Sequence, residues 1–363
     1  MRVGVLADTV AHPGGIGRYV REVLAACGRR TDVRLAVATP AEHTELVTGL
    51  TGASLDSVLT PPRSDQVTLG LWDRHRAGNA FTRAGVDVVI GCKHLVPHRG
   101  PPSVLVVHDV LTITRARENA LLKRLLLPHQ YRRSLHDADR LVAVSAATRS
   151  RVAALDARWA AKCDVVPNGM STHLTTVAAE APVPPPLRPF ALTVGDLSPR
   201  KNLGLLARVW RDRSPGDLDL VVVGPDGGAD TEARGALVAR EPTGRVRWIR
   251  GADDPRLRWC YEHASVVVFP TREEGFGLPL LEARTFHAPV VASTDAAPRE
   301  VAAGAPGVVH VDPDDADGWS RAIAAAAAGP RVTAPPEIPA GALTWDEHTD
   351  RLLAVARATA GIP

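Results

Sequence analysis

Several features that would mark a membrane or secreted protein are missing from the chain. No apolar run approaches the roughly 20 residues of a membrane-spanning helix. No secretory signal is expected, because Met1 and Arg2 lead directly into the strand-like segment VGVLA. The four cysteines lie in or beside apolar segments without CxxC spacing, which predicts buried free thiols: Cys27, Cys92, Cys163 and Cys260. These absences favour a cytoplasmic protein.

Two signatures of other enzyme classes are also absent. The first predicted strand is not followed by GxGxxG, and the second does not end in an acidic residue, so a dinucleotide-dependent oxidoreductase is disfavoured. No DxD pattern stands at the end of a predicted strand. Asp312 and Asp314 have that spacing, but they lie in a polar loop far from the other motifs, and we interpret the segment as a turn. The sequence therefore predicts no metal site.

Length and composition fit two globular domains. The 363 residues exceed one ordinary core, and 45% hydrophobic with 23% charged residues is normal for a soluble protein. The net charge of +3 conceals an asymmetry, because residues 1–180 carry 23 basic and 16 acidic side chains, whereas residues 181–363 carry 20 and 24. The basic half could serve an anionic acceptor or membrane surface, or be the ordinary surface of an arginine-rich protein.

Short apolar runs alternate with helical patterns, which is typical of parallel α/β sheets. In the first half, strands are predicted at 3–7, 34–38, 86–90, 103–107, 140–144 and near Val165, and helices at 18–28 and between 119 and 137. In the second half, strands are predicted at 190–194, 218–223, 246–249, 266–269, 290–292 and 307–310, with helices between them.

A proline-rich segment separates the two series of strands. Residues 181–189 (APVPPPLRP) contain five prolines, which neither a helix interior nor a central strand accepts, so we interpret them as a stiff linker. The predicted architecture is α/β, with an N-terminal Rossmann-like domain (1–180), a C-terminal Rossmann-like domain (190–344) and a final helix within 345–363.

A glycine-rich loop joins the first predicted strand to the first helix. Gly14, Gly15 and Gly17 would let backbone N–H groups approach an anion at the helix N-terminus, and a diphosphate is the expected guest. A tight structural turn explains the loop alone equally well.

Two carboxylates bracket a second turn in the segment EEGFGLPLLEA (273–283). Glu274 lies in the loop after a predicted strand and can accept hydrogen bonds from sugar hydroxyls. Glu282 lies in the following helix and can hold the cis-diol of a ribose with two acceptor oxygens. The amides of Gly275 to Leu278 can bind oxygens at the helix start. Helix capping and solvation are the alternative explanation.

Two further motifs follow strands. Arg200 and Lys201 lie in the loop after the first strand of the second half and suit a diphosphate, whose charge grows as it leaves. A solvated basic pair is the alternative, although the chain has only four lysines. His108 and Asp109 follow the strand at 103–107, where open α/β sheets bind ligands. Asp109 could orient the histidine or cap a helix.

With these motifs the chain resembles the retaining glycosyltransferases of family 4. The resemblance covers nearly the whole chain and rests on GGIGRYV (14–20), VVHD (106–109), ADRLVAVSAATRS (138–150), VVPNG (165–169), VGDLSPRKN (194–202), VVVGPDG (221–227) and FPTREEGFGLPLLEA (269–283). It implies the GT-B fold, in which two Rossmann-like domains face each other across a cleft and the last helix crosses back onto the first domain. It also implies a nucleoside-diphosphate sugar as donor and no cofactor or metal requirement.

The resemblance assigns roles to matching residues. Gly14 and Gly15 would contact the donor diphosphate or sugar through the backbone, and His108 would hydrogen-bond the sugar. Arg200 and Lys201 would hold the diphosphate, and Arg250, in the loop 250–253, would lie near the base. The remaining donor contacts would come from Glu274, Gly275, Phe276, Gly277 and Leu278, with Glu282 on the ribose.

Two positions depart from the family pattern. Asp196 stands where many members carry arginine, so one diphosphate contact is missing and Arg200 with Lys201 must suffice. His287 replaces the glycine that commonly ends the helix after the second glutamate. A non-glycine residue in a left-handed helix cap costs about 1 kcal/mol.

The predicted function is therefore transfer of a hexosyl group from a GDP-mannose-like or UDP-linked donor to a hydroxyl of a glycan, glycolipid or small metabolite. A same-face reaction without metal is expected, in a bacterial, cytoplasmic enzyme without a nucleic-acid partner. A sugar-nucleotide epimerase of the same fold and a non-catalytic sugar-nucleotide-binding protein are the alternatives. Residues 115–136 mix basic residues with leucine and could form a helix that contacts an anionic membrane. Pro128 interrupts this pattern, and a core-facing helix with a basic outer face is the preferred interpretation.

Overall fold

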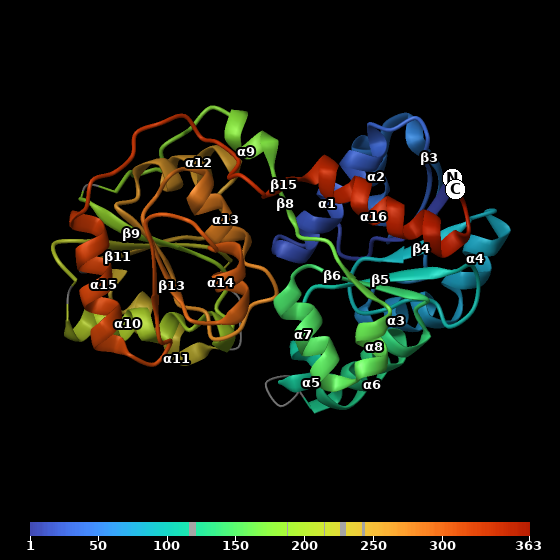
Figure 1. Cartoon of the computed structure of the whole chain (residues 1–363), viewed down its shortest axis with the longest axis horizontal. Coiled ribbons are helices and arrows are strands. Elements are labelled where there is room, and N and C mark those ends of the chain that lie inside the picture. The colour runs from blue at the N-terminus through green and yellow to red at the C-terminus, as the bar shows by residue number, and fades with distance from the viewer. Residues whose placement is uncertain (116–120, 187, 214, 226–229, 242–243) are drawn as a thin grey trace. The chain divides into compact units, whose positions relative to one another are not determined.

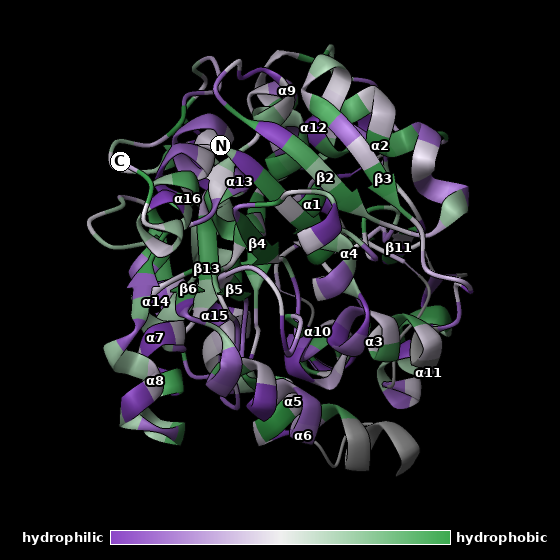
Figure 2. Ribbon diagram, turned by 90° about the vertical axis from the view of Figure 1, so that its right-hand side faces the viewer, coloured by the Kyte–Doolittle hydropathy of each residue, from purple (hydrophilic) through white to green (hydrophobic). Residues whose placement is uncertain are grey.

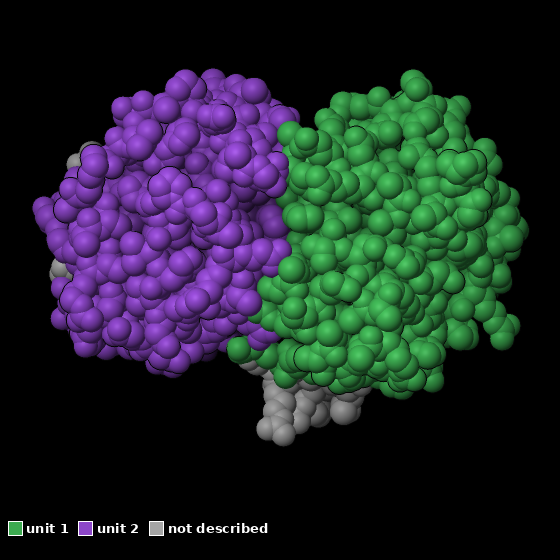
Figure 3. Space-filling view, viewed as in Figure 1, with its two compact units in different colours: residues 1–169, 343–363 green, residues 170–342 purple. Residues whose placement is uncertain are grey.

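The computed structural model of the chain describes residues 1–115, 121–186, 188–213, 215–225, 230–241 and 244–363. They form two compact units, one of residues 1–169 with 343–363 and one of residues 170–342, coloured separately in Figure 3. The boundary precedes the proline-rich segment, so the predicted linker lies inside the second unit. The reason is that residues after Gly169 already pack there. The Arg258 guanidinium donates to the carbonyls of Thr175 and Val177, each at 2.7 Å.

The first unit is built on a seven-stranded sheet in the order β3-β2-β1-β4-β5-β6-β7, with parallel pairing. Its strands are β1 (Arg2–Leu6), β2 (Arg34–Ala38), β3 (Leu55–Leu59), β4 (Val88–Gly91), β5 (Ser103–Val107), β6 (Arg140–Ala143) and β7 (Cys163–Val165). The sequence missed β3, because this edge strand, LDSVL, is only half-buried and lacks an apolar run. The central strands are fully buried, and in Figure 2 they are the hydrophobic layer of the ribbon.

Helices cover both faces of this sheet (Figure 1). They are α1 (Gly15–Gly28), α2 (Thr44–Thr51), α3 (Gln66–His75), α4 (Ala77–Arg83), α5 (Leu111–Thr114), α6 (Leu121–Asp137), α7 (Ala146–Leu155), α8 (Ala157–Ala161) and α16 (Trp345–Ala360). The prediction that Pro128 interrupts its helix was wrong, because α6 continues through it. Of the basic residues in the candidate membrane-contacting segment 115–136, Arg117 lies outside the described residues.

The second unit repeats the plan with a six-stranded sheet in the order β11-β10-β9-β12-β13-β14. Its strands are β9 (Phe190–Val194), β10 (Asp219–Val223), β11 (Val246–Ile249), β12 (Val266–Phe269), β13 (Val290–Ser293) and β14 (Val308–Val311). Its helices are α9 (Thr172–Thr176), α10 (Leu203–Asp212), α11 (Thr231–Val238), α12 (Asp254–His263), α13 (Leu278–Thr285), α14 (Ala296–Val301) and α15 (Ala316–Ala328). Short strands β8 (Gly169–Met170) and β15 (Leu343–Thr344) pair where the chain passes between the units.

The strand orders locate the place in each sheet where a ligand can bind. In the first unit the chain reverses direction across the sheet between β1 and β4, and in the second between β9 and β12. Loops that leave such a switch point run in opposite directions and open a crevice at the carboxyl ends of the strands. Two α/β units with parallel sheets were predicted from the sequence, and this prediction is confirmed.

The last helix returns to the first unit, as predicted. Helix α16 packs against α1 and against β4 and β5. Its buried face presents Trp345, His348, Leu352, Leu353 and Ala356 to that core. Its start is fixed by a capping box, in which the Thr344 hydroxyl accepts from the Glu347 amide and the Glu347 carboxylate accepts from the Thr344 amide.

The four cysteines are free and buried, as predicted. Burial raises the pKa of the Cys27 thiol to about 12, so this thiol stays protonated and unreactive. Among the helices that the structure describes, none is long and apolar enough to cross a membrane.

Candidate donor site

The loops that follow β9 and β12 meet at the switch point of the second unit. A short 3-10 turn, Pro199–Lys201, carries the basic pair. The Arg200 carbonyl accepts from the Arg272 amide at 2.7 Å and from the Thr271 hydroxyl at 3.0 Å. Asn202, in a left-handed conformation, donates through its side-chain amide to the carbonyl of Pro270 at 3.2 Å. These bonds tie the two loops together and fix the backbone that carries Arg200 and Lys201.

Arg200, Lys201 and Glu274 form one cluster, which we call the basic cluster. Arg200 Nη1 donates to both Glu274 carboxylate oxygens at 2.9 and 3.0 Å, and Lys201 Nζ donates to Oε2 at 2.6 Å. Lys201 also lies over the ring of Phe269, 5.1 Å from its centroid. The side chains of Arg200, Lys201 and Glu274 are 23%, 11% and 13% exposed, so water screens their charges only in part.

The charge of the basic cluster is set by its pairing. Burial alone would raise the pKa of Glu274, but the attraction of Arg200 and Lys201, with their hydrogen bonds, outweighs burial and lowers that pKa to about 2. Glu274 is therefore ionised at neutral pH. The Glu274 carboxylate thus faces two cations, and these are groups that can pair with an anionic ligand.

The backbone of the Glu274 loop is held from a third strand. The Glu274 amide donates to the Asp295 carboxylate at 3.0 Å, and Asp295 follows β13. Asp295 was not predicted from the sequence, although an acidic residue just after a predicted strand was a visible signal. Gly277 then starts α13 with φ +109°, a backbone conformation that side chains other than glycine rarely adopt. This turn directs the chain from the loop into the helix that carries Glu282.

The other predicted residues of the segment 273–283 lie either in the loop before α13 or within α13. Gly275 directs its amide toward Glu274 Oε1 at 3.3 Å, whereas the Phe276 ring is buried and Leu278 begins α13. Glu282 is only 3% exposed and accepts a hydrogen bond from the Tyr261 hydroxyl at 2.7 Å. Tyr261 was not predicted, and its contact leaves fewer carboxylate lone pairs for a ribose than the sequence suggested.

Arg250 lies apart from the basic cluster, after the edge strand β11. Its guanidinium is 4.6 Å from the centroid of the Trp248 indole and pairs with Glu241 at 2.9 Å. With Pro182, Val183 and Arg256 it lines a surface hollow of about 320 Å³. The hollow offers a stacked cation and backbone groups to a flat ligand.

The two departures from the family pattern have local explanations. Asp196 Oδ1 accepts from the Ser198 hydroxyl at 2.6 Å and turns the loop toward the basic pair. His287 has φ +53°, so it occupies the left-handed position expected for glycine, and its Nε2 is 3.0 Å from the Pro335 carbonyl. Asp312 forms a turn by accepting from the Asp314 amide at 2.9 Å, as interpreted from the sequence. Across the described residues, no group of acidic, histidine and cysteine side chains could hold a metal ion.

In the first unit, Gly14 and Gly15 lie where α1 begins, after β1. The Gly14 amide donates to His12 Nδ1 at 3.0 Å and is therefore engaged within the protein. No atom lies within 4 Å of a Cβ placed on Gly15, whereas a Cβ on Gly17 would lie 1.9 Å from the His12 carbonyl oxygen. Gly17 thus serves the turn, and Gly15 leaves open space at the helix N-terminus.

Alanine substitutions should separate these two roles. Gly17→Ala forces the backbone to move, which typically costs about 1–3 kcal/mol, so its melting temperature should fall by several degrees. Gly15→Ala should melt like the wild type and yet bind a donor more weakly, because its methyl group fills the open space. Differential scanning fluorimetry with and without nucleotide sugars measures both. Equal stability losses would contradict the distinction.

The His108 ring is positioned by contacts with Cys92 and Tyr19. Its Nε2–H donates to the Cys92 carbonyl at 2.9 Å, and its ring meets the edge of Tyr19 on α1, with centroids 4.6 Å apart. Burial lowers the pKa of His108, so the ring is neutral and its Nδ1 is an acceptor. Asp109 accepts from the Leu111 amide at 3.0 Å in the turn that leads into α5, whose N-cap residue is Val110.

Helix α16 reaches this site through His348. His348 Nδ1 lies 2.8 Å from the Pro167 carbonyl, which fixes the proton on Nδ1 and leaves Nε2 to accept from the Tyr19 hydroxyl at 2.9 Å. Tyr19 in turn packs on His108. His348 was not predicted from the sequence, because its partners are more than 180 residues away in the chain. The last helix therefore supports the residue that the sequence marked as a sugar ligand.

The buried histidines make stability sensitive to acid. Burial lowers the pKa of His348 to about 4, whereas an unfolded histidine titrates near 6.5, so the unfolded chain binds this proton first as the pH falls. The contribution of neutral His348 to the free energy of unfolding is roughly 3 kcal/mol. It is complete above pH 6.5 and is lost as the pH is lowered to about 4. Urea unfolding across this window should show the loss, and His348→Gln should reduce it. The exposed His173 provides the control in His173→Gln, which should leave the slope unchanged.

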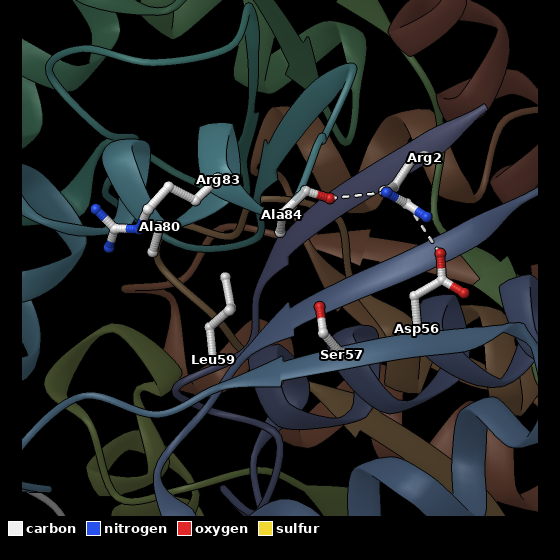
Figure 4. A pocket seen from close by; sticks show the side chains of 7 residues that line it. All are labelled: Arg2, Asp56, Ser57, Leu59, Ala80, Arg83 and Ala84. Atoms are coloured by element: carbon white, nitrogen blue, oxygen red, sulfur yellow. Dashed lines mark hydrogen bonds and ion pairs between the residues drawn. The ribbon is translucent and has the colours of Figure 1, made fainter.

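A second surface hollow lies in the first unit but offers no comparable chemistry. It has a volume of about 390 Å³ and is lined by residues of β1, β3 and α4, shown in Figure 4. Arg2 spans it, donating to the Asp56 carboxylate and the Ala84 carbonyl, each at 2.9 Å. The lining follows the edge strand β3 from Asp56 to Leu59, so the hollow does not lie at the switch point between β1 and β4, where α/β sheets bind ligands. We assign these residues a structural role.

Comparison with known families matches both units. Residues 13–174 match the family model described as Glycosyltransferase Family 4, and residues 179–333 match the one described as Glycosyl transferases group 1. Together the two matches span most of the chain.

Individual relatives are more distant. The chain is 27% identical over 249 residues to O-antigen chain mannosyltransferase B of Escherichia coli, covering 64% of this chain and 63% of that protein. It is 29% identical over 238 residues to D-inositol 3-phosphate glycosyltransferase of Mycobacterium avium, covering 61% and 55%. The matched segment thus spans less than two thirds of either relative.

Solved structures show the same fold. Sucrose-phosphate synthase from Thermosynechococcus elongatus superimposes with a TM-score of 0.67 at 18% identity, covering 99% of this chain and 96% of that one. Anabaena Alr3699/HepE in complex with UDP-glucose gives 0.67 at 16% identity, covering 99% and 98%. At these identities the likeness concerns the fold, which is the GT-B fold expected from the sequence.

Proposed function

Since the chain belongs to glycosyltransferase family 4, we propose that it transfers a hexosyl group from a nucleoside-diphosphate sugar to a hydroxyl acceptor. The observation that carries the proposal is the basic cluster at the switch point of the second unit. Arg200 and Lys201 provide charge for a diphosphate, and Glu274 provides acceptor oxygens for sugar hydroxyls. We further propose that the reaction retains the anomeric configuration and needs no metal ion.

In the cluster without ligand, Glu274 acts as counter-ion to both cations. A bound diphosphate would compete for Arg200 and Lys201 and release carboxylate oxygens of Glu274 for hydroxyls of the donor sugar. The cations then gain interaction energy as negative charge builds on the leaving diphosphate, which is the condition for lowering a barrier rather than merely tightening binding. The partial burial of the cluster strengthens this effect.

The bond changes balance without a protein nucleophile. The bond between the anomeric carbon and the phosphate oxygen breaks, and the acceptor oxygen bonds to the same face of that carbon. The acceptor proton passes to the departing phosphate oxygen. His108, neutral and with Nε2 held by Cys92, would accept a hydrogen bond from a sugar hydroxyl at Nδ1. Its role is thus to orient the sugar.

The remaining donor contacts follow the same proposal. The backbone at Gly15 would approach the donor, Glu282 would contact the ribose beside Tyr261, and the hollow next to Arg250 would receive the base. A mannosyl or glucosyl donor is supported by the relatives, which include a mannosyltransferase and a structure with UDP-glucose. The acceptor would be a glycan, a glycolipid or a small metabolite.

A donor screen tests the function. The purified protein is incubated with UDP-, GDP-, ADP- and dTDP-sugars, and nucleoside diphosphate release and melting temperature are recorded, because a bound ligand raises apparent stability. One donor should stabilise the protein and be consumed only with a hydroxyl acceptor, and NMR should show retained configuration. Conversion of a donor without acceptor would indicate an epimerase, and binding without turnover a non-catalytic protein. Loss of transfer in EDTA that a divalent ion restores would contradict the metal-free reaction.

We also propose a bacterial, cytoplasmic location, which the four free buried cysteines and the bacterial relatives support. The basic excess of residues 1–180 would allow peripheral binding to an anionic membrane. Flotation with anionic liposomes at low and high salt tests this contact. Absence of salt-sensitive flotation would contradict it.

A further inference from the structure

Three buried rings connect the last helix to His108. Tyr19 on α1 packs nearly perpendicular to the His108 ring, with centroids 4.6 Å apart. The same Tyr19 ring packs against Trp345 and His348 on α16, at centroid distances of 5.5 and 5.2 Å. Tyr19, Trp345 and His348 are at most 3% exposed. Figure 1 shows α16 beside α1 in the first unit, where the two helices are in contact. The surroundings of His108 therefore extend to α16.

The hydrogen bonds between these rings have a fixed direction. His348 Nδ1–H donates to the Pro167 carbonyl at 2.8 Å, so its Nε2 can only accept, and it accepts from the Tyr19 hydroxyl at 2.9 Å. Burial raises the pKa of Tyr19, so the hydroxyl keeps its proton and can donate. A buried hydroxyl without a partner is unfavourable, because it has lost its water and gains no bond in exchange. His348 therefore determines where the Tyr19 ring lies.

Two contacts restrain the His108 ring in different ways. The bond from Nε2–H to the Cys92 carbonyl, at 2.9 Å, holds one nitrogen but leaves the ring free to tilt. The Tyr19 ring stands at 85° to the His108 ring and limits this tilt. Tilting would displace Nδ1, the nitrogen that remains to accept a hydrogen bond from a sugar hydroxyl. The orientation of that acceptor thus depends on Tyr19, and through Tyr19 on His348.

We propose that Tyr19 and His348 are positioning residues of the transfer reaction, which hold the plane of the His108 ring and thereby orient the donor sugar. The inference rests on the proposed function, because it concerns the residue that contacts the sugar in that reaction. It gives α16 a role in the reaction besides its contribution to stability. Since the basic cluster holds the diphosphate in the second unit, a loss of sugar orientation should lower kcat and leave donor KM nearly unchanged.

Variants of the two residues test the positioning role in the full-length protein. Tyr19→Phe removes the hydroxyl and keeps the ring, so the protein should fold while kcat falls about tenfold. Donor KM and the donor-induced shift in melting temperature should stay within about twofold of wild type. His348→Leu removes the acceptor of the same bond and should give a similar loss. Because the two residues act as one unit, the double variant should lose little more than either single variant.

A conservative variant and a matched control separate positioning from general damage to α16. His348→Gln keeps an oxygen that can accept from the Tyr19 hydroxyl, and it should retain more of kcat than His348→Leu. Thr349 is equally buried on α16, but within the described residues its hydroxyl has no hydrogen-bond partner. Thr349→Val should therefore melt at or above the wild-type temperature and keep kcat within about twofold. A loss of kcat in Thr349→Val as large as that in Tyr19→Phe would overturn the inference.

Substitution of His108 shows whether Tyr19 acts through it. His108→Asn keeps an acceptor near the position of Nδ1 but has no ring for Tyr19 to hold. Adding Tyr19→Phe to this variant should lower kcat by less than about twofold. An equal loss with and without the His108 ring would overturn the inference, as would an unchanged kcat in Tyr19→Phe alone, and both results leave the proposed function intact. Failure of the wild type to consume any donor would instead reject the proposed function.

Discussion

Replacing Lys201 with alanine should lower kcat/KM by about 10²–10³-fold, because it removes a preorganised cation from the leaving diphosphate. Lys201 is 11% exposed, contacts Glu274 at 2.6 Å and is held over Phe269, so water cannot readily take its place. The Glu274 carboxylate keeps Arg200 as a partner, and the variant should fold. Steady-state kinetics with the preferred donor measure the effect, which should lie mainly in kcat.

The matched control is Arg213→Ala, in the same unit. Arg213 forms an exposed ion pair with Asp317, of the kind that contributes about 0–1 kcal/mol. The Arg213→Ala variant should keep kcat/KM within about twofold of wild type. If Lys201→Ala also stayed within a few-fold, the basic cluster could not be the diphosphate site, and the assignment of Arg200 and Glu274 would fail with it.

Truncating the chain after Ala342 should prevent the first unit from folding cooperatively. The deletion removes Trp345, Leu352 and Leu353, which are almost completely buried in that unit. Each buried side chain of this size contributes about 1.5–3 kcal/mol, so together they approach the whole net stability of a domain, about 5–15 kcal/mol. The deletion also removes His348, which contacts Tyr19, and Tyr19 in turn packs against His108. Calorimetry should show loss of one transition, and limited proteolysis should leave a resistant fragment close to residues 170–342.

Removal of only Gly361 to Pro363 provides the control. These residues follow α16 and are exposed or half-buried, so the shortened chain should melt within about 1 °C of wild type. A truncation at Ala342 that retained both transitions would show that α16 is dispensable for the first unit. The capping box and the buried apolar face of α16 would then need another explanation.

Much of the fold was predictable because local patterns agreed with the final structure. Strands β2, β5, β9, β11 and β12 were predicted to the residue, since each is a short apolar run with clear ends. The edge strand β3 was missed because LDSVL has the polarity of a surface segment. Pro128 was misjudged because proline is generally unfavourable inside helices, yet α6 accommodates it. The boundary was predicted at the proline-rich segment 181–189, whereas the second unit begins at Met170. Prolines indicate a stiff segment, but they do not show which unit the neighbouring residues pack against.

The sequence by itself determined the class of the protein and singled out the residues of the basic cluster. Arg200, Lys201 and Glu274 each follow a recognisable strand, and parallel strands bring their carboxyl ends to one edge. Only the tertiary structure decided how these residues are paired, because the contact between Arg200 and Glu274 spans 74 positions. The same holds for His348, whose contact with Tyr19 spans 329 positions and whose burial lowers the pKa of its ring. Charge, burial and partner are properties of the folded environment, and no local pattern carries them.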